Sequence, residues 1–296
     1  MAKRKTKRPS TGPDSRPDSR SDSRSGPRPA RRRGGPGRAA PRDRAGGTYW
    51  LYGVHPVLAA LANPRRHIER LVLSPEAAGT WGQRLRQERD PRHAGLAPES
   101  LDRRGIESLL PEGAVHQGLA AKVTPLEQPA IEDVLETPAS AEPAAPRRRV
   151  VLLLDQVTDP HNVGAVLRSV AAFGAGAVVV PDKGAPEESG TLAKSASGAL
   201  EAIPYIRVVN LARSLDTLKS AGFWCLGLAD EAPRSLADSD PADAVALVLG
   251  AEGGGLRRLT RERCDLLVKL PTRPPIQALN ISNAAAVALY ELLGRG

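Results

Sequence analysis

Apolar runs alternate with helix-patterned segments through the second half of the chain, and this alternation constrains the fold most. The first run, Val150–Leu154, contains no polar residue and suits a strand buried on both faces. Further strands are expected at 177–180, 205–208, 223–228, 245–249 and 266–270, and helices at 162–173, 188–197, 211–220 and 282–293. This order predicts a parallel sheet covered on both faces, with ligands at the carboxyl ends of its strands.

A smaller α/β unit is expected over residues 48–124. Its pattern predicts a helix at Val54–Leu61, a strand at Ile68–Leu73, a helix at Trp81–Glu88 and a strand at Val115–Val123. A segment rich in Pro, Ala and Glu follows at 125–147 and is typical of a linker. The chain is therefore predicted to consist of 48–124, the linker 125–147 and the larger α/β domain 148–296, after an N-terminal arm.

The arm, residues 1–47, carries all the net positive charge. It has 15 Lys or Arg against 4 Asp, whereas residues 48–296 have 27 against 29. It is also rich in Pro, Ser and Gly, so it is predicted to be disordered and to bind a polyanion, most readily RNA. A solubilising tail without a partner is the alternative, and a mitochondrial transit peptide is disfavoured because aspartates interrupt the cationic pattern.

Composition excludes several classes of protein. Two cysteines cannot form a disulfide framework or a four-thiolate zinc site, and His55, His116 and His161 lack metal-ligand spacing, so we expect no metal. Aromatic residues, at 3%, are too few for the stacking surfaces of single-strand binders. The sequence has no apolar run of about 20 residues and no secretory signal, which predicts a cytoplasmic protein without a membrane segment.

The first candidate loop follows the Val150 strand and opens into a helix that presents Arg168. By helical spacing, Arg168 shares one face with three small residues, Gly164, Ala165 and Ala172. Small side chains would let a ligand approach a fixed cation there. Alternatively, Arg168 pairs with Asp155 or Asp159, and Asn162 only caps the helix.

The second candidate loop, Gly250–Gly255, follows the strand at 245–249 and holds four glycines and Glu252. Its glycines would let the backbone wrap a ligand. The spacing is not that of a dinucleotide-binding turn or a P-loop, which disfavours both. The alternative is a tight turn with a solvated Glu252.

The third candidate loop, Leu270–Asn283, is proline-rich and leads into an alanine-rich helix predicted to be buried. Asn280 and Ser282 offer hydrogen bonds beside the positive end of the helix dipole. The alternative for Ser282 is a helix cap.

In this order, the three loops resemble the three sequence motifs of the SpoU (TrmH) family of RNA ribose 2′-O-methyltransferases, within the SPOUT class. Segments 52–57, 113–118 and 207–213 extend the resemblance, which covers about 49–293. It implies an L30e-like RNA-binding domain at 48–124, and a deep trefoil knot in the α/β domain 148–296. It also implies a homodimer.

The implied activity is S-adenosylmethionine-dependent 2′-O-methylation of a guanosine in 23S rRNA, free or in an assembling particle. By the resemblance, the methyl donor would contact Gly250, Ala251, Gly253, Leu270 and Leu279. The catalytic centre would comprise Asn162, Arg168, Glu252 and Asn280. The resemblance implies that Arg168 is the base. Because a guanidinium stays protonated, we instead expect it to grip the 3′ phosphate, stabilise the developing alkoxide and pass the proton on.

Three other functions remain open from the sequence. The same chemistry could act on tRNA, although the separate 48–124 domain argues against this. A non-catalytic ribosome assembly factor is also possible, because Ala278 replaces the family's usual serine and Pro274 and Pro275 stiffen the third loop. A nucleotide-dependent oxidoreductase is a distant fourth.

Overall fold

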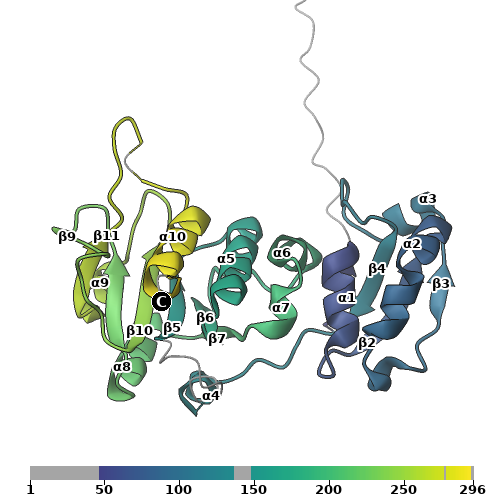
Figure 1. The fold of residues 1–296 in the computed structure, drawn as a ribbon, viewed down its shortest axis with the longest axis horizontal. Coiled ribbons are helices and arrows are strands. Elements are labelled where there is room, and N and C mark those ends of the chain that lie inside the picture. Colours follow the sequence, from purple (N-terminus) through teal and green to yellow (C-terminus); the bar gives the residue numbers. More distant parts are fainter. Residues whose placement is uncertain (1–46, 137–147, 277, 295–296) are drawn as a thin grey trace, which may run out of the picture. The chain divides into compact units, whose positions relative to one another are not determined.

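The computed structural model describes residues 47–136, 148–276 and 278–294 (Figure 1). The predicted basic arm, apart from Gly47, and residues 137–147 of the predicted linker lie outside the described residues. The described residues belong to one compact unit. They build a seven-stranded and a four-stranded sheet.

The seven-stranded sheet confirms the prediction of a parallel sheet. Its order is β7-β6-β5-β10-β8-β11-β9, and each adjacent pair runs parallel. The strands are β5 (Arg149–Asp155), β6 (Ala177–Pro181), β7 (Tyr205–Val208), β8 (Trp224–Leu228), β9 (Arg234–Ser235), β10 (Ala244–Gly250) and β11 (Leu266–Lys269). Because β10 lies between β5 and β8, the carboxyl ends of β5 and β10 meet, with Gly250 opposite Asp155.

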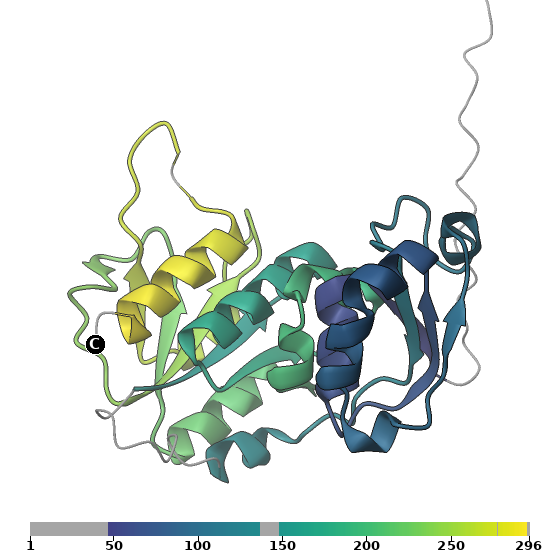
Figure 2. The ribbon, with the colours of Figure 1, turned by 45° about the vertical axis from the view of Figure 1, so that its right-hand side comes forward.

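Helices cover both faces of this sheet because side chains alternate along each strand. Leu152 and Leu154 pack in a core with α5 (Pro160–Phe173), α6 (Gly190–Ala196) and α10 (Ile281–Leu293), whereas Val151 and Leu153 pack with α8 (Leu211–Ser220). Figure 2 shows α5 and α10 side by side over one face. Two short helices, α7 (Ala199–Ala202) and α9 (Arg258–Arg263), complete this region.

The predicted linker contains a helix, α4 (Ile131–Glu136), which the composition of the segment did not reveal. Ile131 and Val134 are buried in the same core as Val151 and Leu153. Arg149 donates hydrogen bonds to the backbone carbonyls of Val134 and Leu135. Two apolar side chains therefore anchor this part of the predicted linker to the sheet.

The four-stranded sheet has the order β1-β4-β2-β3 and forms the second, smaller α/β region. Strand β4 runs antiparallel to both β1 and β2, and β2 runs parallel to β3. The elements are β1 (Tyr49–Tyr52), α1 (Val54–Ala62), β2 (Ile68–Leu73), α2 (Pro75–Gln87), the 3₁₀ helix η1 (Pro91–His93), β3 (Pro98–Ser100), α3 (Arg103–Glu107) and β4 (Leu119–Val123).

Two predicted elements of this region have different bounds. Helix α2 begins at Pro75 rather than Trp81, because the Ser74 side chain caps its N-terminus and Pro75 has a φ suited to the first turn. Strand β4 begins at Leu119 rather than Val115, because Gly113, Gln117 and Gly118 adopt positive φ and turn the chain.

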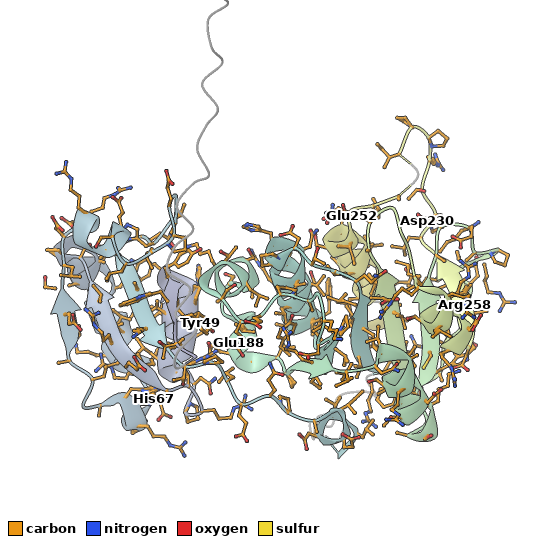
Figure 3. All side chains as sticks on the ribbon, turned by 180° about the vertical axis from the view of Figure 1, so that it is seen from behind. Tyr49, His67, Glu188, Asp230, Glu252 and Arg258 are labelled. Carbon is orange, nitrogen blue, oxygen red and sulfur yellow. The ribbon has the colours of Figure 1, made fainter. Side chains whose placement is uncertain are left out.

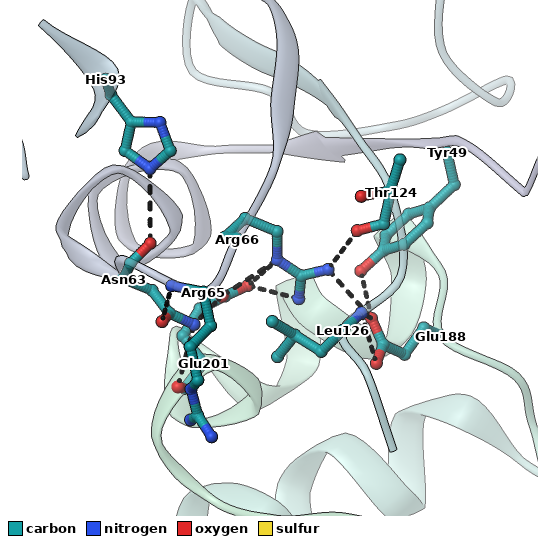
Figure 4. Close-up of polar contacts among 9 residues, drawn as sticks. All are labelled: Tyr49, Asn63, Arg65, Arg66, His93, Thr124, Leu126, Glu188 and Glu201. Atoms are coloured by element: carbon teal, nitrogen blue, oxygen red, sulfur yellow. Dashed lines mark hydrogen bonds and ion pairs between the residues drawn. The ribbon is translucent and has the colours of Figure 1, made fainter.

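A buried ion cluster joins the two regions (Figure 4). The Arg66 guanidinium has no exposed area and pairs with Glu201 at 2.7 Å and with Glu188 at 3.1 Å. The Tyr49 hydroxyl donates to Glu188 at 2.9 Å. Burial raises the pKa of Tyr49, and the nearby charge of Glu188 raises it further, so the phenol stays a donor. Arg66 also donates to the Thr124 carbonyl at 2.7 Å, which fixes the chain just beyond β4.

Candidate functional site

A cavity of about 510 Å³ opens at the carboxyl ends of β8, β10 and β11, where the parallel sheet was expected to bind its ligand. All five residues expected to bind the methyl donor line it: Gly250, Ala251, Gly253, Leu270 and Leu279. Glu252 and Asn280 line it as well. Figure 3 shows Glu252 and Asp230 at the same end of the sheet.

The glycine loop closes on itself at the cavity wall. The Gly255 N–H donates to the Ala251 carbonyl at 2.9 Å. A Cβ atom on Gly250 would lie 2.1 Å from the Gly255 carbonyl carbon, so no side chain fits there. Gly250 is thus required by the loop's own backbone, whereas a Cβ on Gly253 would meet nothing within 4 Å.

Asp155 anchors the return of this loop. It is fully buried at the end of β5 and accepts hydrogen bonds from the Arg257 backbone N–H at 2.9 Å and the Arg257 Nε at 2.6 Å. Asp159 is the N-cap of α5 and accepts from the His161 N–H. Neither carboxylate pairs with Arg168, so that alternative is wrong, and the cap of α5 is Asp159 rather than Asn162.

Asn280 connects the second and third loops with α5. Its Nδ2 donates to Glu252 Oε1 at 2.6 Å and to Asn162 Oδ1 at 3.1 Å. Its Oδ1 accepts from the Ser282 N–H at 2.9 Å, so Asn280 rather than Ser282 caps α10. Glu252 also accepts from the Ile281 N–H at 3.4 Å, which rules out a merely solvated Glu252. The structure therefore brings three of the four expected catalytic residues together.

Arg168 stands apart from these three residues. It is exposed, does not line the cavity, and makes no hydrogen bond or ion pair with the described part of the chain. Arg168 lies six positions after Asn162 in the chain, which places the two residues about 9 Å apart along the axis of α5. Gly164 allows α5 to pack closely against α6 rather than giving a ligand access, because a Cβ there would lie 2.5 Å from the Ser195 Cβ on α6.

The departures from the family pattern fall in two places. Ala278 lines the cavity, so this replacement alters its wall. Pro274 and Pro275 do not line it. Their ring atoms therefore leave the cavity open.

The sequence reasoning missed the contribution of β8. Leu228, Asp230 and Glu231 line the cavity from the carboxyl end of that strand. Glu231 pairs with Arg261, which also lines the cavity. The adjacent acids Asp230 and Glu231, shortly after an apolar strand, could have indicated this part of the site, since ligands of parallel sheets gather there.

Neither cysteine has the environment of a nucleophile. Cys225 is buried within β8, and Cys264 is half-buried after α9. Burial raises the pKa of each thiol to about 12. Within the described ranges, the structure has no group of three or more His, Cys, Asp or Glu residues arranged to hold a metal ion. No helix there is both long and apolar enough to cross a membrane.

Two family models match the chain. The SpoU rRNA Methylase family matches residues 149–290, and the RNA 2′-O ribose methyltransferase substrate binding family matches residues 50–129. A curated relative from Vibrio cholerae, the 23S rRNA (guanosine-2′-O-)-methyltransferase RlmB, is 41% identical over 244 residues, which cover 81% of this chain and 94% of the relative. The chain belongs to the SpoU rRNA methylase family.

Other SpoU family members are similar in sequence and fold. RlmB from Xanthomonas campestris pv. campestris is 41% identical over 247 residues, covering 82% of this chain and 94% of that protein. The crystal structure of the SpoU methyltransferase AviRb from Streptomyces viridochromogenes with the cofactor AdoMet has a TM-score of 0.67 and 23% identity, covering 84% of this chain and 90% of AviRb. The AdoMet-bound rRNA methyltransferase from Sinorhizobium meliloti has a TM-score of 0.67 and 18% identity, covering 84% and 88%.

Proposed function

We propose that this SpoU family protein transfers a methyl group from S-adenosylmethionine to the ribose 2′-oxygen of a guanosine in 23S rRNA. The observation that carries the proposal is the cavity at which all five expected donor-binding residues meet Glu252 and Asn280. The names of the curated relatives support 23S rRNA guanosine as the acceptor, in preference to tRNA.

The cavity suits the methyl donor in size and chemistry. Its volume lies within the ordinary range for small-molecule sites. Leu270 and Leu279 offer apolar walls for a flat ring, and the Asp230 carboxylate offers a charge that complements a cationic amino group. When bound, S-adenosylmethionine supplies a methyl group on a sulfonium, which is a good leaving group.

The hydrogen bonds of Asn280 determine which polar atoms of Glu252 and Asn162 remain available to contact the acceptor ribose. Glu252 Oε1 is occupied by Asn280, which leaves Oε2 to accept a hydrogen bond from the ribose hydroxyl. Asn162 gives its Oδ1 to Asn280, and its Nδ2 has no partner in the described chain, so it remains to donate to a ribose oxygen. Glu252 and Asn162 therefore position the hydroxyl, and Asn280 positions both of them.

Arg168 interacts with the negative charge of the RNA backbone. An exposed guanidinium without a protein partner is available for bidentate binding to an RNA phosphate. When bound RNA lies across both groups, this cation also stabilises the alkoxide that develops as the ribose hydroxyl passes its proton to Glu252 Oε2. Arg168 is therefore the residue that binds the backbone next to the acceptor.

A homodimer fits the outer surface of α10. Val287 and Tyr290 are 47% and 52% exposed, and their spacing puts them on one side of the helix. The Phe173 ring of α5 meets Tyr290 edge-on at 6.2 Å. Sedimentation equilibrium of Val287→Glu should give a lower mass than the wild type, because a charge would enter the apolar interface.

Four further features belong to the same proposal. The segment from β11 to α10 forms a deep trefoil knot, for which the return of α10 to α5 is the support. Residues 48–124 form an L30e-like domain that binds the RNA, 148–296 form the methyltransferase domain, and the linker lies between them. The basic arm 1–47 adds affinity for rRNA. The protein works in the cytoplasm, where ribosomes assemble.

The test is methyl transfer from labelled S-adenosylmethionine to unmodified 23S rRNA, with the product mapped by ribose-methylation sequencing. One guanosine should gain the label, and its 2′-deoxy form should gain none. Arg168→Ala should abolish transfer while donor affinity, measured by calorimetry, stays within about threefold. A wild-type chain that fails to bind the donor would instead favour a ribosome assembly factor.

A further inference from the structure

A second hollow, of about 1070 Å³, lies in the smaller α/β region, away from the cavity of the methyl donor. Helix α2, helix α3 and the loop before β4 form its walls. We call it the His116 groove, and six of its residues define it: Glu76, Trp81, Arg103, Glu107, Val115 and His116. The catalytic residues described above do not line it.

His116 has one ring nitrogen that the protein leaves without a partner. The side chain is 4% exposed. Its Nδ1 accepts a hydrogen bond from the Gly118 N–H at 3.1 Å, which assigns the proton of the neutral ring to Nε2. Nε2 has no hydrogen-bond partner in the described structure, and the closest carboxylate oxygen, on Glu107, is 3.9 Å away. A buried N–H donor without a hydrogen-bond partner therefore lies in the wall of the groove, beneath its surface.

The structural role of His116 does not explain this donor. The turn before β4 uses only Nδ1. Gly118 is packed so closely that a Cβ would lie 2.6 Å from the Ser74 Oγ and 2.7 Å from the Ala77 Cβ, so the turn is held against α2 by backbone packing. Leaving a buried N–H unpaired is unfavourable, because the group loses its hydrogen bond to water. A ligand acceptor at Nε2 would recover that free energy.

The lining favours a neutral, flat ligand over a phosphate. Three carboxylates, on Glu76, Glu107 and Glu112, face the groove with a single guanidinium, Arg103, which already pairs with Glu107 at 2.9 Å. This excess of negative charge repels phosphate. Val115 is 65% exposed at the groove, which is unusual for valine. With the half-buried Trp81 ring it supplies apolar surface.

We propose that the His116 groove binds one unstacked guanine base of the RNA substrate, at a site separate from the methylated ribose. The O6 atom of guanine accepts from His116 Nε2–H, the N1–H and N2 amino groups donate to a groove carboxylate, and the ring lies against Trp81 and Val115. Single-stranded RNA is commonly read in this way, base by base. The inference rests on the proposed function only in that RNA is the substrate.

The test measures binding of short RNA to the full-length chain by fluorescence anisotropy. The probes are labelled heptanucleotides with six uridines and a central G, A, C or U. The wild type should bind the G probe about tenfold more tightly than the U probe, which corresponds to about 1.4 kcal/mol. Contacts of the basic arm with phosphates add equally to all four probes, so the difference reports on the base.

Three variants test whether the preference for the G probe arises in the His116 groove. His116→Phe should remove the preference for G and leave U binding unchanged, whereas His116→Gln, which keeps a donor, should retain most of it. Val115→Asp, at an exposed position, should weaken G binding even if the His116 variants fold poorly. Val209→Asp is the matched control, since Val209 is 95% exposed and lies outside the groove. Melting temperature and donor affinity check the fold of each variant.

Three results would overturn the proposal. The first is equal affinity of the wild type for all four probes, and the second is an unchanged G preference in both His116→Phe and Val115→Asp. An equal loss of affinity for all probes in these variants would also overturn it, because it indicates phosphate binding. Failure of the groove is distinguishable from failure of the proposed function, since methyl transfer and donor binding are measured separately from probe selectivity.

Discussion

Replacing Arg66 with Met should destabilise the protein far more than an ordinary loss of an ion pair. Arg66 is fully buried and is the cation that both Glu188 and Glu201 contact, and their side chains are 6% and 5% exposed. Methionine keeps most of the volume but leaves two buried carboxylates without a counter-ion. Removing one partner from a buried ion pair costs about 3–5 kcal/mol. For a fold of this size, that loss lowers the melting temperature by roughly 6–20 °C.

The assay is thermal and urea unfolding, with Arg70→Met as the control. Arg70 pairs with Glu99 at 2.7 Å, but both side chains are about 40% exposed, so its loss should cost less than about 1 kcal/mol. Adding Glu201→Gln to Arg66→Met should recover part of the stability. Equal small losses in the Arg66 and Arg70 variants would refute the reasoning.

Two further predictions concern the site, and a third concerns the two cysteines. Gly250→Ala should lower donor affinity more than about tenfold by calorimetry, because its Cβ would collide with the Gly255 backbone. Asn280→Leu should cost about 1 kcal/mol of stability through the lost cap and slow labelled-methyl transfer about 100-fold or more. Cys225 and Cys264, with pKa values raised to about 12, should resist alkylation at pH 8 in the native state and react once unfolded. Because raised values favour the protonated folded form, the thiols' contribution to stability is complete below about pH 8.5 and declines toward pH 12.

The parallel sheet was predictable because it depends on local patterns. Val150–Leu154 is apolar without interruption, and only a strand buried on both faces uses such a run. The helix α4 escaped prediction because its six residues lie in a proline-rich segment, and only burial of Ile131 and Val134 against the sheet makes it stable. Short elements are determined by tertiary packing, which a local pattern does not contain.

The candidate site was likewise predictable only in part. The cavity residues were predictable because each loop follows a recognisable strand and ligands collect at that edge of the sheet. The individual partners were not, since Glu252 and Asn280 are 28 residues apart and Asn162 is 118 residues from Asn280. The same holds for Arg66, whose partners lie 122 and 135 residues away. No local pattern distinguishes this buried arginine from the solvated Arg65 beside it.

In the reaction we propose, Asn280 would couple the methyl donor with the acceptor ribose through its position at the start of α10. Its Oδ1 caps the helix, and this fixes the side chain so that Nδ2 reaches Glu252 and Asn162. The preceding residue, Leu279, lines the donor cavity. Donor and acceptor contacts therefore come from adjacent residues whose register is set by where α10 begins. Because α10 also packs against α5, which carries Asn162 and Arg168, folding of this one helix brings the donor wall and the ribose-positioning groups into register together.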